Sequence, residues 1–173
     1  YEVLILDEDI DEFVISTVPE YDSVPLKAIN RSDAMDDIQT EEEKKELETQ
    51  NSEFKAMLDE MKECLGDKVN GVRFTDKLKN HPVCLTSEGG ISSEMEKTLN
   101  TMPGNEQKIK AQLILEINGN HPVADKLKGL YDTDKDTLKK YTKMLYDASC
   151  LIGGRNIDDP VEYSNLVCEL MIK

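Results

Sequence analysis

Apolar positions recur at helical spacing over the last forty residues of the chain. The first stripe consists of Leu138, Tyr141, Leu145, Ala148 and Ile152, and the second of Tyr163, Leu166, Val167, Leu170 and Met171. Spacings of three and four residues place each stripe on one face of a helix. Gly153-Gly154 ends the first helix, and Asp159-Pro160 supplies an N-cap and a first-turn proline for the second. Both apolar faces need a cover, so the pattern predicts a homodimer interface formed by these two stripes.

The middle of the chain alternates short strands with helices. Three alternating segments, 72–75, 83–86 and 113–117, predict a small three-stranded sheet. Helical spacing predicts helices at 54–65, where Gly66 provides the stop, and at 91–102. A further helix is expected after His121-Pro122, with Val123, Leu127 and Leu130 on its buried side, and Thr133 with Asp136 resembles a capping box for the next helix. The fold class predicted is therefore α+β, with a helical hairpin at the end.

The first sixty residues follow a different pattern. An apolar run at 2–6, a helix capped by Asp9 and a possible strand at 25–29 look like the closing part of an α/β unit. Residues 36–63 are strongly acidic and poor in apolar residues until Phe54, which predicts a solvated helix or linker. The chain has no initiator Met and no signal-peptide pattern, so we expect it to be part of a longer protein.

Composition narrows the class of protein. The chain has 173 residues, 38% of them hydrophobic, and no run long enough for a membrane span. A net charge of −15 argues against a nucleic-acid partner, because phosphate binding needs a basic face. The four cysteines form no C-x-x-C pair, which predicts reduced thiols and a cytoplasmic location.

No catalytic or metal site is predicted from the motifs. Residues 132–136 resemble the first half of a calcium loop, but Thr137 and Lys143 occupy its glycine and glutamate positions. Gly89-Gly90 lacks the lysine of a phosphate-binding loop. Cys64, His81 and Cys84 match no zinc spacing, and the Pro after each histidine indicates an element boundary.

The helix predicted at 91–102 allows two interpretations. Ile91, Met95, Leu99 and Met102 fall on one face. Such a stripe is most often ordinary core, and the pattern alone favours that interpretation. Methionine also suits an exposed surface that must fit several partners. Exposure of the stripe decides between them.

Five short stretches in order resemble the ninety-kilodalton heat-shock chaperone family, most closely its bacterial HtpG type. The stretches are 2–6, 10–13, Val72 to Leu78, Leu115 to Asn118 with the following His121, and Ile157 to Pro160. The resemblance spans nearly the whole chain. It implies that residues 1–50 close the family's α/β/α middle domain with an acidic linker helix and that 51–173 form its dimerisation domain. The terminal hairpins of two protomers would then form an intermolecular four-helix bundle.

The resemblance also implies a function. The chain would be the dimerisation and client-binding region of an ATP-dependent chaperone that assists folding of other proteins under stress. Client proteins would dock on a partly exposed surface formed by Glu12, Phe13, Ile91, Met95, Leu99 and Met102. The chain departs from the family at Thr98, where an apolar residue is common, so this surface could be narrower here.

Cofactors and enzymatic activity are expected elsewhere in the longer protein. In the family, the ATP and Mg²⁺ site and the catalytic arginine lie outside the part that resembles this chain, so no ATPase activity is expected here. The alternative is an acidic helical homodimerisation scaffold or adaptor without chaperone activity. The three strands between the helices fit that alternative poorly.

Overall fold

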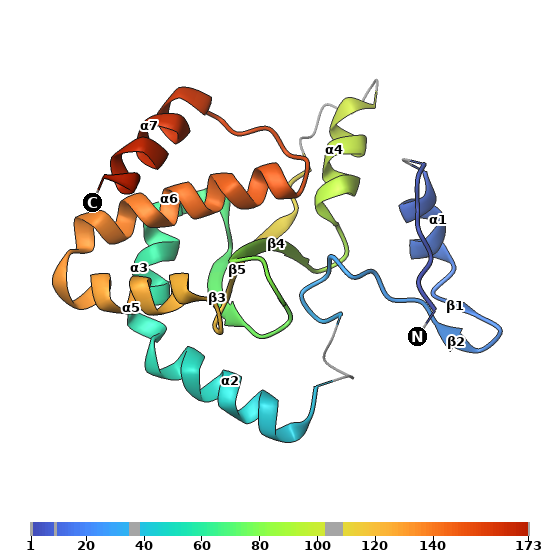
Figure 1. Cartoon of the computed structure of the whole chain (residues 1–173). Coiled ribbons are helices and arrows are strands. Elements are labelled where there is room, and N and C mark those ends of the chain that lie inside the picture. The colour runs from blue at the N-terminus through green and yellow to red at the C-terminus, as the bar shows by residue number, and fades with distance from the viewer. Residues whose placement is uncertain (1, 9, 35–38, 103–108, 173) are drawn as a thin grey trace.

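The computed structural model describes residues 2–8, 10–34, 39–102 and 109–172. The elements in chain order are α1 (Asp11–Thr17), β1 (Glu20–Tyr21), β2 (Val24–Pro25), α2 (Glu41–Glu53), α3 (Lys55–Leu65), a 3₁₀ turn η1 (Gly66–Lys68), β3 (Gly71–Thr75), β4 (Val83–Glu88), α4 (Ser93–Thr101), β5 (Gln112–Asn118), α5 (Pro122–Thr133), α6 (Lys135–Ile152) and α7 (Pro160–Met171). Within these ranges the chain is α+β, as predicted (Figure 1).

A mixed three-stranded sheet of order β3-β5-β4 lies at the centre. β5 pairs parallel with β3 and antiparallel with β4. The sequence alternates along β5, yet Ile114 and Glu116 are buried as well as Leu115 and Ile117. A central strand covered on both faces has no solvent side, so the alternation does not mark a surface here.

The core lies between this sheet and helices α3, α5 and α6 (Figure 1). The sheet contributes Phe74, Leu115 and Ile117, and the helices contribute Met57, Met61, Leu127, Leu138 and Leu145. α2 adds Leu47 and pairs its Asn51 side chain with both backbone groups of Phe74. α2 thus packs on the second part of the chain and continues through the predicted boundary at residue 50.

Most predicted helix ends are confirmed. Gly66 follows α3 with a φ of 58°, a conformation that favours glycine. α6 ends in a Schellman motif, in which Arg155 N–H donates to Cys150 O and Gly154 N–H donates to Leu151 O. Asp159 caps α7. The capping box expected from Thr133 is wrong, because Asp134 caps α6 by accepting from Thr137 N–H.

The strands predicted before residue 30 are wrong. Residues 2–6 are extended and exposed but pair with no other described segment, and a strand needs a neighbour for its backbone groups. Figure 1 shows this segment away from the three-stranded sheet, on the side of α1. The second predicted strand shrinks to Val24–Pro25, which pairs with β1. Asp9 lies outside the described residues, and Ile10 stands at the N-cap of α1.

Within the described ranges, no helix has both the length and the apolar character required to cross a membrane.

Candidate functional site

The two terminal helices pack against each other along the inner face of α7 (Figure 1). Leu166 and Leu170 are buried there, and Tyr163 and Val167 are half-buried beside them. Lys140 of α6 bonds Glu169 of α7 at one end of the contact. The predicted second stripe, apart from exposed Met171, is thus already covered within one chain.

The first stripe divides between the core and the surface. Leu138 and Leu145 belong to the core cluster, where Leu145 is only 3% exposed. They have no surface to offer a partner, so the expectation that these two residues contact a second chain is corrected. Tyr141 and Ala148 are half-buried, and Ile152 is exposed at the end of α6.

α7 carries apolar residues on its outer side as well. Val161 and Cys168 lie seven residues apart on one face, opposite Leu166 and Leu170, and the C-cap residue Ile172 follows Cys168 by four. Val161 is 69% exposed and Ile172 is 87% exposed. We call these three residues the outer α7 face. The predicted second stripe did not include these residues, although their spacing in the sequence is also helical.

Further apolar side chains are exposed at the ends of the two helices. Leu151 and Ile152 close α6, and Met171 closes α7. Together with the outer α7 face they give the hairpin several exposed apolar side chains, next to the exposed polar residues Ser164 and Asn165 of α7. Single exposed apolar residues are ordinary, but a row of them along one helix face is typical of an interface.

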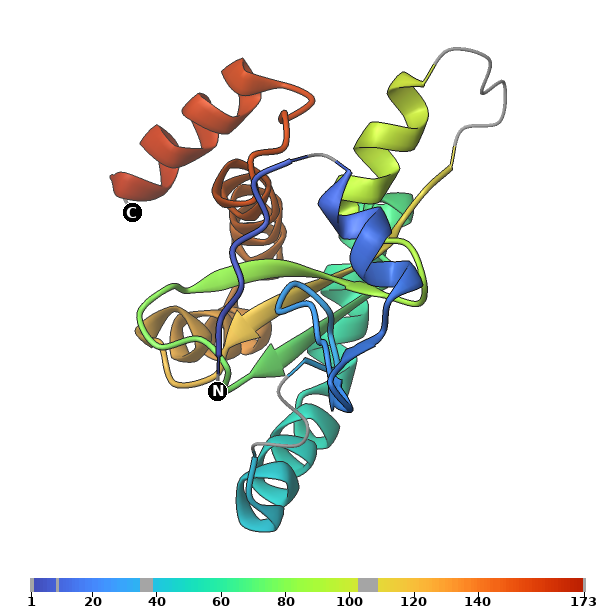
Figure 2. The same ribbon diagram turned by 90° about the vertical axis from the view of Figure 1, so that its right-hand side faces the viewer.

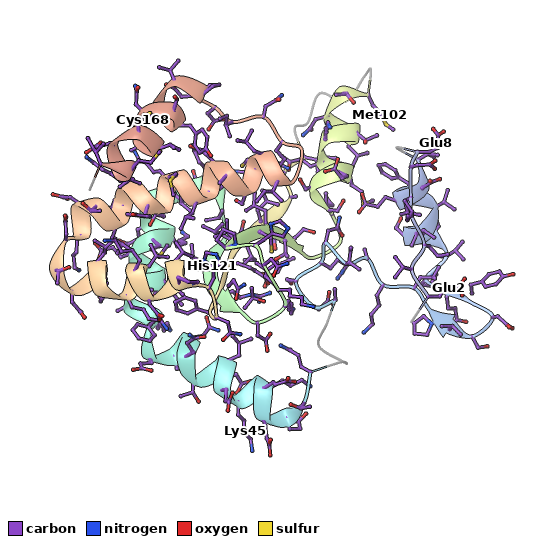
Figure 3. All side chains as sticks on the ribbon, viewed as in Figure 1. Glu2, Glu8, Lys45, Met102, His121 and Cys168 are labelled. Atoms are coloured by element: carbon purple, nitrogen blue, oxygen red, sulfur yellow. The ribbon has the colours of Figure 1, made fainter. Side chains whose placement is uncertain are left out.

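The predicted client stripe is neither core nor fully exposed. No residue within α4 is buried, and Met95 and Leu99 are half-buried. Ile91 packs against the core, whereas Met102 is exposed at the end of α4 away from the sheet (Figure 3). The core interpretation therefore holds for Ile91 and fails for Met102.

The remaining two predicted client residues come from α1. Glu12 and Phe13 are half-buried. α1 and α4 stand on the same side of the molecule in both ribbon views (Figures 1 and 2). Ile10, Val14 and Val18 of this segment are exposed. Apolar and half-buried side chains from two distant parts of the sequence thus occupy one side of the structure.

The cysteines and histidines do not assemble a reactive site in the described ranges, where no group of three or more His, Cys, Asp or Glu side chains could hold a metal. Burial, together with the nearby Glu116 carboxylate, raises the pKa of the Cys84 thiol to about 12. Burial also raises the pKa of the Cys150 thiol. Both thiols stay protonated at neutral pH, and protonated thiols are poor nucleophiles and metal ligands. His121 instead caps α5, its Nδ1 accepting from Val123 N–H at 3.2 Å.

A model of the Hsp90 protein family matches residues 1–173. Chaperone protein HtpG of Natranaerobius thermophilus is 50% identical to the chain over 171 residues, and that of Clostridium botulinum strain Loch Maree is 46% identical over 171 residues. Chaperone protein HtpG of Bacillus subtilis is 43% identical over 172 residues. Each alignment covers 99% of this chain and 27% of the relative. Because the family model matches all 173 residues of this chain, the chain belongs to the Hsp90 family.

Proposed function

We propose that this chain is the dimerisation and client-binding region of an ATP-dependent molecular chaperone. The family assignment supports the chaperone activity, and the relatives carry that name. The observation that carries the dimerisation role is that α7 has apolar residues on two faces, Leu166 and Leu170 packed on α6 and the three residues of the outer α7 face exposed. ATP would be bound and hydrolysed by parts of the longer protein.

The outer α7 face is the proposed centre of the dimer contact. In a symmetric dimer, α7 and the exposed end of α6 would meet the same elements of a second chain and give a four-helix bundle. Exposed Val161 and Ile172 would each gain about 1.5 to 3 kcal/mol on full burial, before the entropy cost of association. That gain explains why a helix would keep two apolar faces.

The dimer is tested by placing charges on the outer α7 face. The native chain should have twice the 19.6 kDa chain mass in sedimentation equilibrium at micromolar concentration. Val161→Asp with Ile172→Asp should give the monomer mass with an unchanged helical circular dichroism signal. Ser52→Asp with Ala56→Asp adds the same charge at exposed positions of α2 and α3 and should leave the dimer intact. A monomeric native chain would contradict the proposal.

A charge at a core position of α6 should behave differently. Leu145→Asp buries a carboxylate in the core cluster, where an unpaired charge is very costly. We therefore expect loss of the folded signal at every protein concentration. The outer-face and core variants together separate dissociation from unfolding.

The client-binding role rests on the side of the molecule formed by α1 and α4. Apolar side chains held partly in water gain free energy when another apolar segment covers them, and unbranched methionine adapts to different shapes. Met95, Leu99 and Met102 offer that character on α4, and Phe13 adds an aromatic ring on α1. The charge of −15 would favour clients with a positive balance and make binding sensitive to salt.

Client binding is tested with a double variant on α4. Met95→Ser with Leu99→Ser should weaken suppression of heat-induced aggregation of citrate synthase, while the dimer mass stays unchanged. Glu94→Ser with Lys97→Ser, at exposed positions of the same helix, preserves the net charge and should have little effect. Dimers that never suppress aggregation would support the acidic scaffold instead. A large loss of thermal stability in the Met95 and Leu99 variant would assign the stripe to the core.

A further inference from the structure

α4 is attached to the rest of the chain mainly at its two ends. Its N-cap Ser92 is buried, and Ile91 before it packs on the core. In its last turn, the Asn100 side chain exchanges two hydrogen bonds with the backbone of Ile109, at 2.8 and 2.9 Å. Because no side chain within α4 is buried, apolar packing contributes little to holding this helix in place.

One arginine connects the first turns of α4 to the α6–α7 hairpin. The Arg155 guanidinium donates to Ser93 Oγ and, from both terminal nitrogens, to Glu96 Oε2 at 3.3 Å. The two charged side chains are mostly shielded from water, 25% exposed for Arg155 and 15% for Glu96. An ion pair with this degree of burial and two donors is stronger than an exposed pair.

The backbone of Arg155 is itself fixed to the end of α6. Its N–H makes one of the two Schellman hydrogen bonds, to Cys150 O at 2.8 Å, and Gly154 before it has a φ of 65°. The far end of the same loop is held by Asp158, which lies 2.8 Å from Lys68 Nζ. The guanidinium therefore reaches α4 from a loop that is attached at both of its ends.

We propose that Arg155 is a positioning residue that sets the placement of α4, and with it the proposed client surface, relative to the dimerisation hairpin. The effect on client binding rests on the proposed function, whereas the contacts of Arg155 with α4 do not depend on it. Leu151 and Ile152, which belong to the proposed dimer contact, precede Arg155 by only four and three residues. A partner chain that packs on the end of α6 would thus reinforce the support from which Arg155 holds α4.

The test measures amide hydrogen exchange of α4 by mass spectrometry in the full chain. Arg155→Met keeps a long apolar side chain and removes the guanidinium. We expect α4 exchange to rise about tenfold, equivalent to about 1.4 kcal/mol, while β5 exchange and the dimer mass stay unchanged. The combination Arg155→Glu with Glu96→Arg restores an opposite-charge pair and should recover part of the protection.

Lys140→Met is the matched control, because it removes a lysine–glutamate pair of the hairpin that does not involve α4. Unchanged α4 exchange in Arg155→Met, or equal loosening by Lys140→Met, would overturn the positioning role. Aggregation suppression by the same variants gives a separate result. If α4 loosens in Arg155→Met but the native chain never suppresses citrate synthase aggregation, Arg155 positions α4 and the client-binding proposal fails.

Discussion

Arg73→Met should destabilise the fold strongly, because it leaves a buried carboxylate without its cation. Glu116 lies in the central strand and is 1% exposed. Arg73 lies opposite it in β3 and donates to Glu116 Oε1 from Nε at 2.9 Å and also from a terminal nitrogen. Among the described residues, the only other hydrogen-bond donor to this carboxylate is the Cys84 thiol, 3.9 Å from Oε2.

The magnitude follows from the burial of the two partners. Breaking a fully buried ion pair by removing one partner costs about 3 to 5 kcal/mol. The Arg73 side chain is 35% exposed, so water can approach the pair and the lower end, about 3 kcal/mol, is expected. With a urea dependence of about 2 kcal/mol per molar, the unfolding midpoint should fall by about 1.5 M. Protein concentration must be held constant, because dimerisation also contributes to stability.

The assay is urea unfolding followed by circular dichroism, with two matched variants. Arg73→Met with Glu116→Leu removes both charges and should recover most of the loss, since no buried charge then remains unpaired. Lys140→Met breaks an ion pair whose partners are both more than one-third exposed and should change the midpoint little. A loss below about 1 kcal/mol for Arg73→Met, or a double variant as unstable as the single one, would refute this reasoning.

Three further predictions concern single contacts. Asn51→Ala should cost about 1 to 3 kcal/mol by thermal melting, because both backbone groups of Phe74 lose their partner; an unchanged melting temperature would show that water replaces the amide. Asp159→Ala should cost about 1 kcal/mol through loss of the α7 cap, and Asp159→Asn should restore most of it. The hydrogen bond from Lys68 lowers the pKa of Asp158, so the stabilisation it gives is present above the carboxyl's ordinary pKa and is lost as pH falls through the lowered value. Melting of Lys68→Met and the native chain should therefore differ at pH 7 and converge at strongly acidic pH, and a constant difference would contradict this.

The sheet and most helices could be predicted because their signals are local. Strand alternation, Gly66, Gly153 and the Asp159 cap each act within a few residues, and the structure bears them out. Residues 2–6 carry an equally local apolar signal, but strand formation also needs a partner at another place in the chain. A local apolar pattern therefore predicts a strand only where another strand is available to pair with it, as for β3, β4 and β5.

The candidate surfaces were harder to predict, because periodicity identifies an apolar face without saying what covers it. Leu145 and Met171 looked equivalent as members of two stripes, yet one is core and the other is exposed. Arg155 gave no signal at all, since its partner Glu96 lies 59 residues earlier in the chain. Contacts over that distance depend on how α4 and α6 are arranged around the sheet.

The hairpin divides two tasks between its helices, and the division follows from burial. α6 inserts Leu138 and Leu145 into the core, so it is held in place whether or not a second chain is present. α7 is held to α6 by Leu166, Leu170 and surface ion pairs, and its outer face has no cover within the described chain. A second chain would therefore stabilise α7 much more than α6, because binding energy adds most where the single chain supplies least. On this view, the same exposed face that makes α7 the weaker helix of a single chain makes it the centre of the proposed dimer.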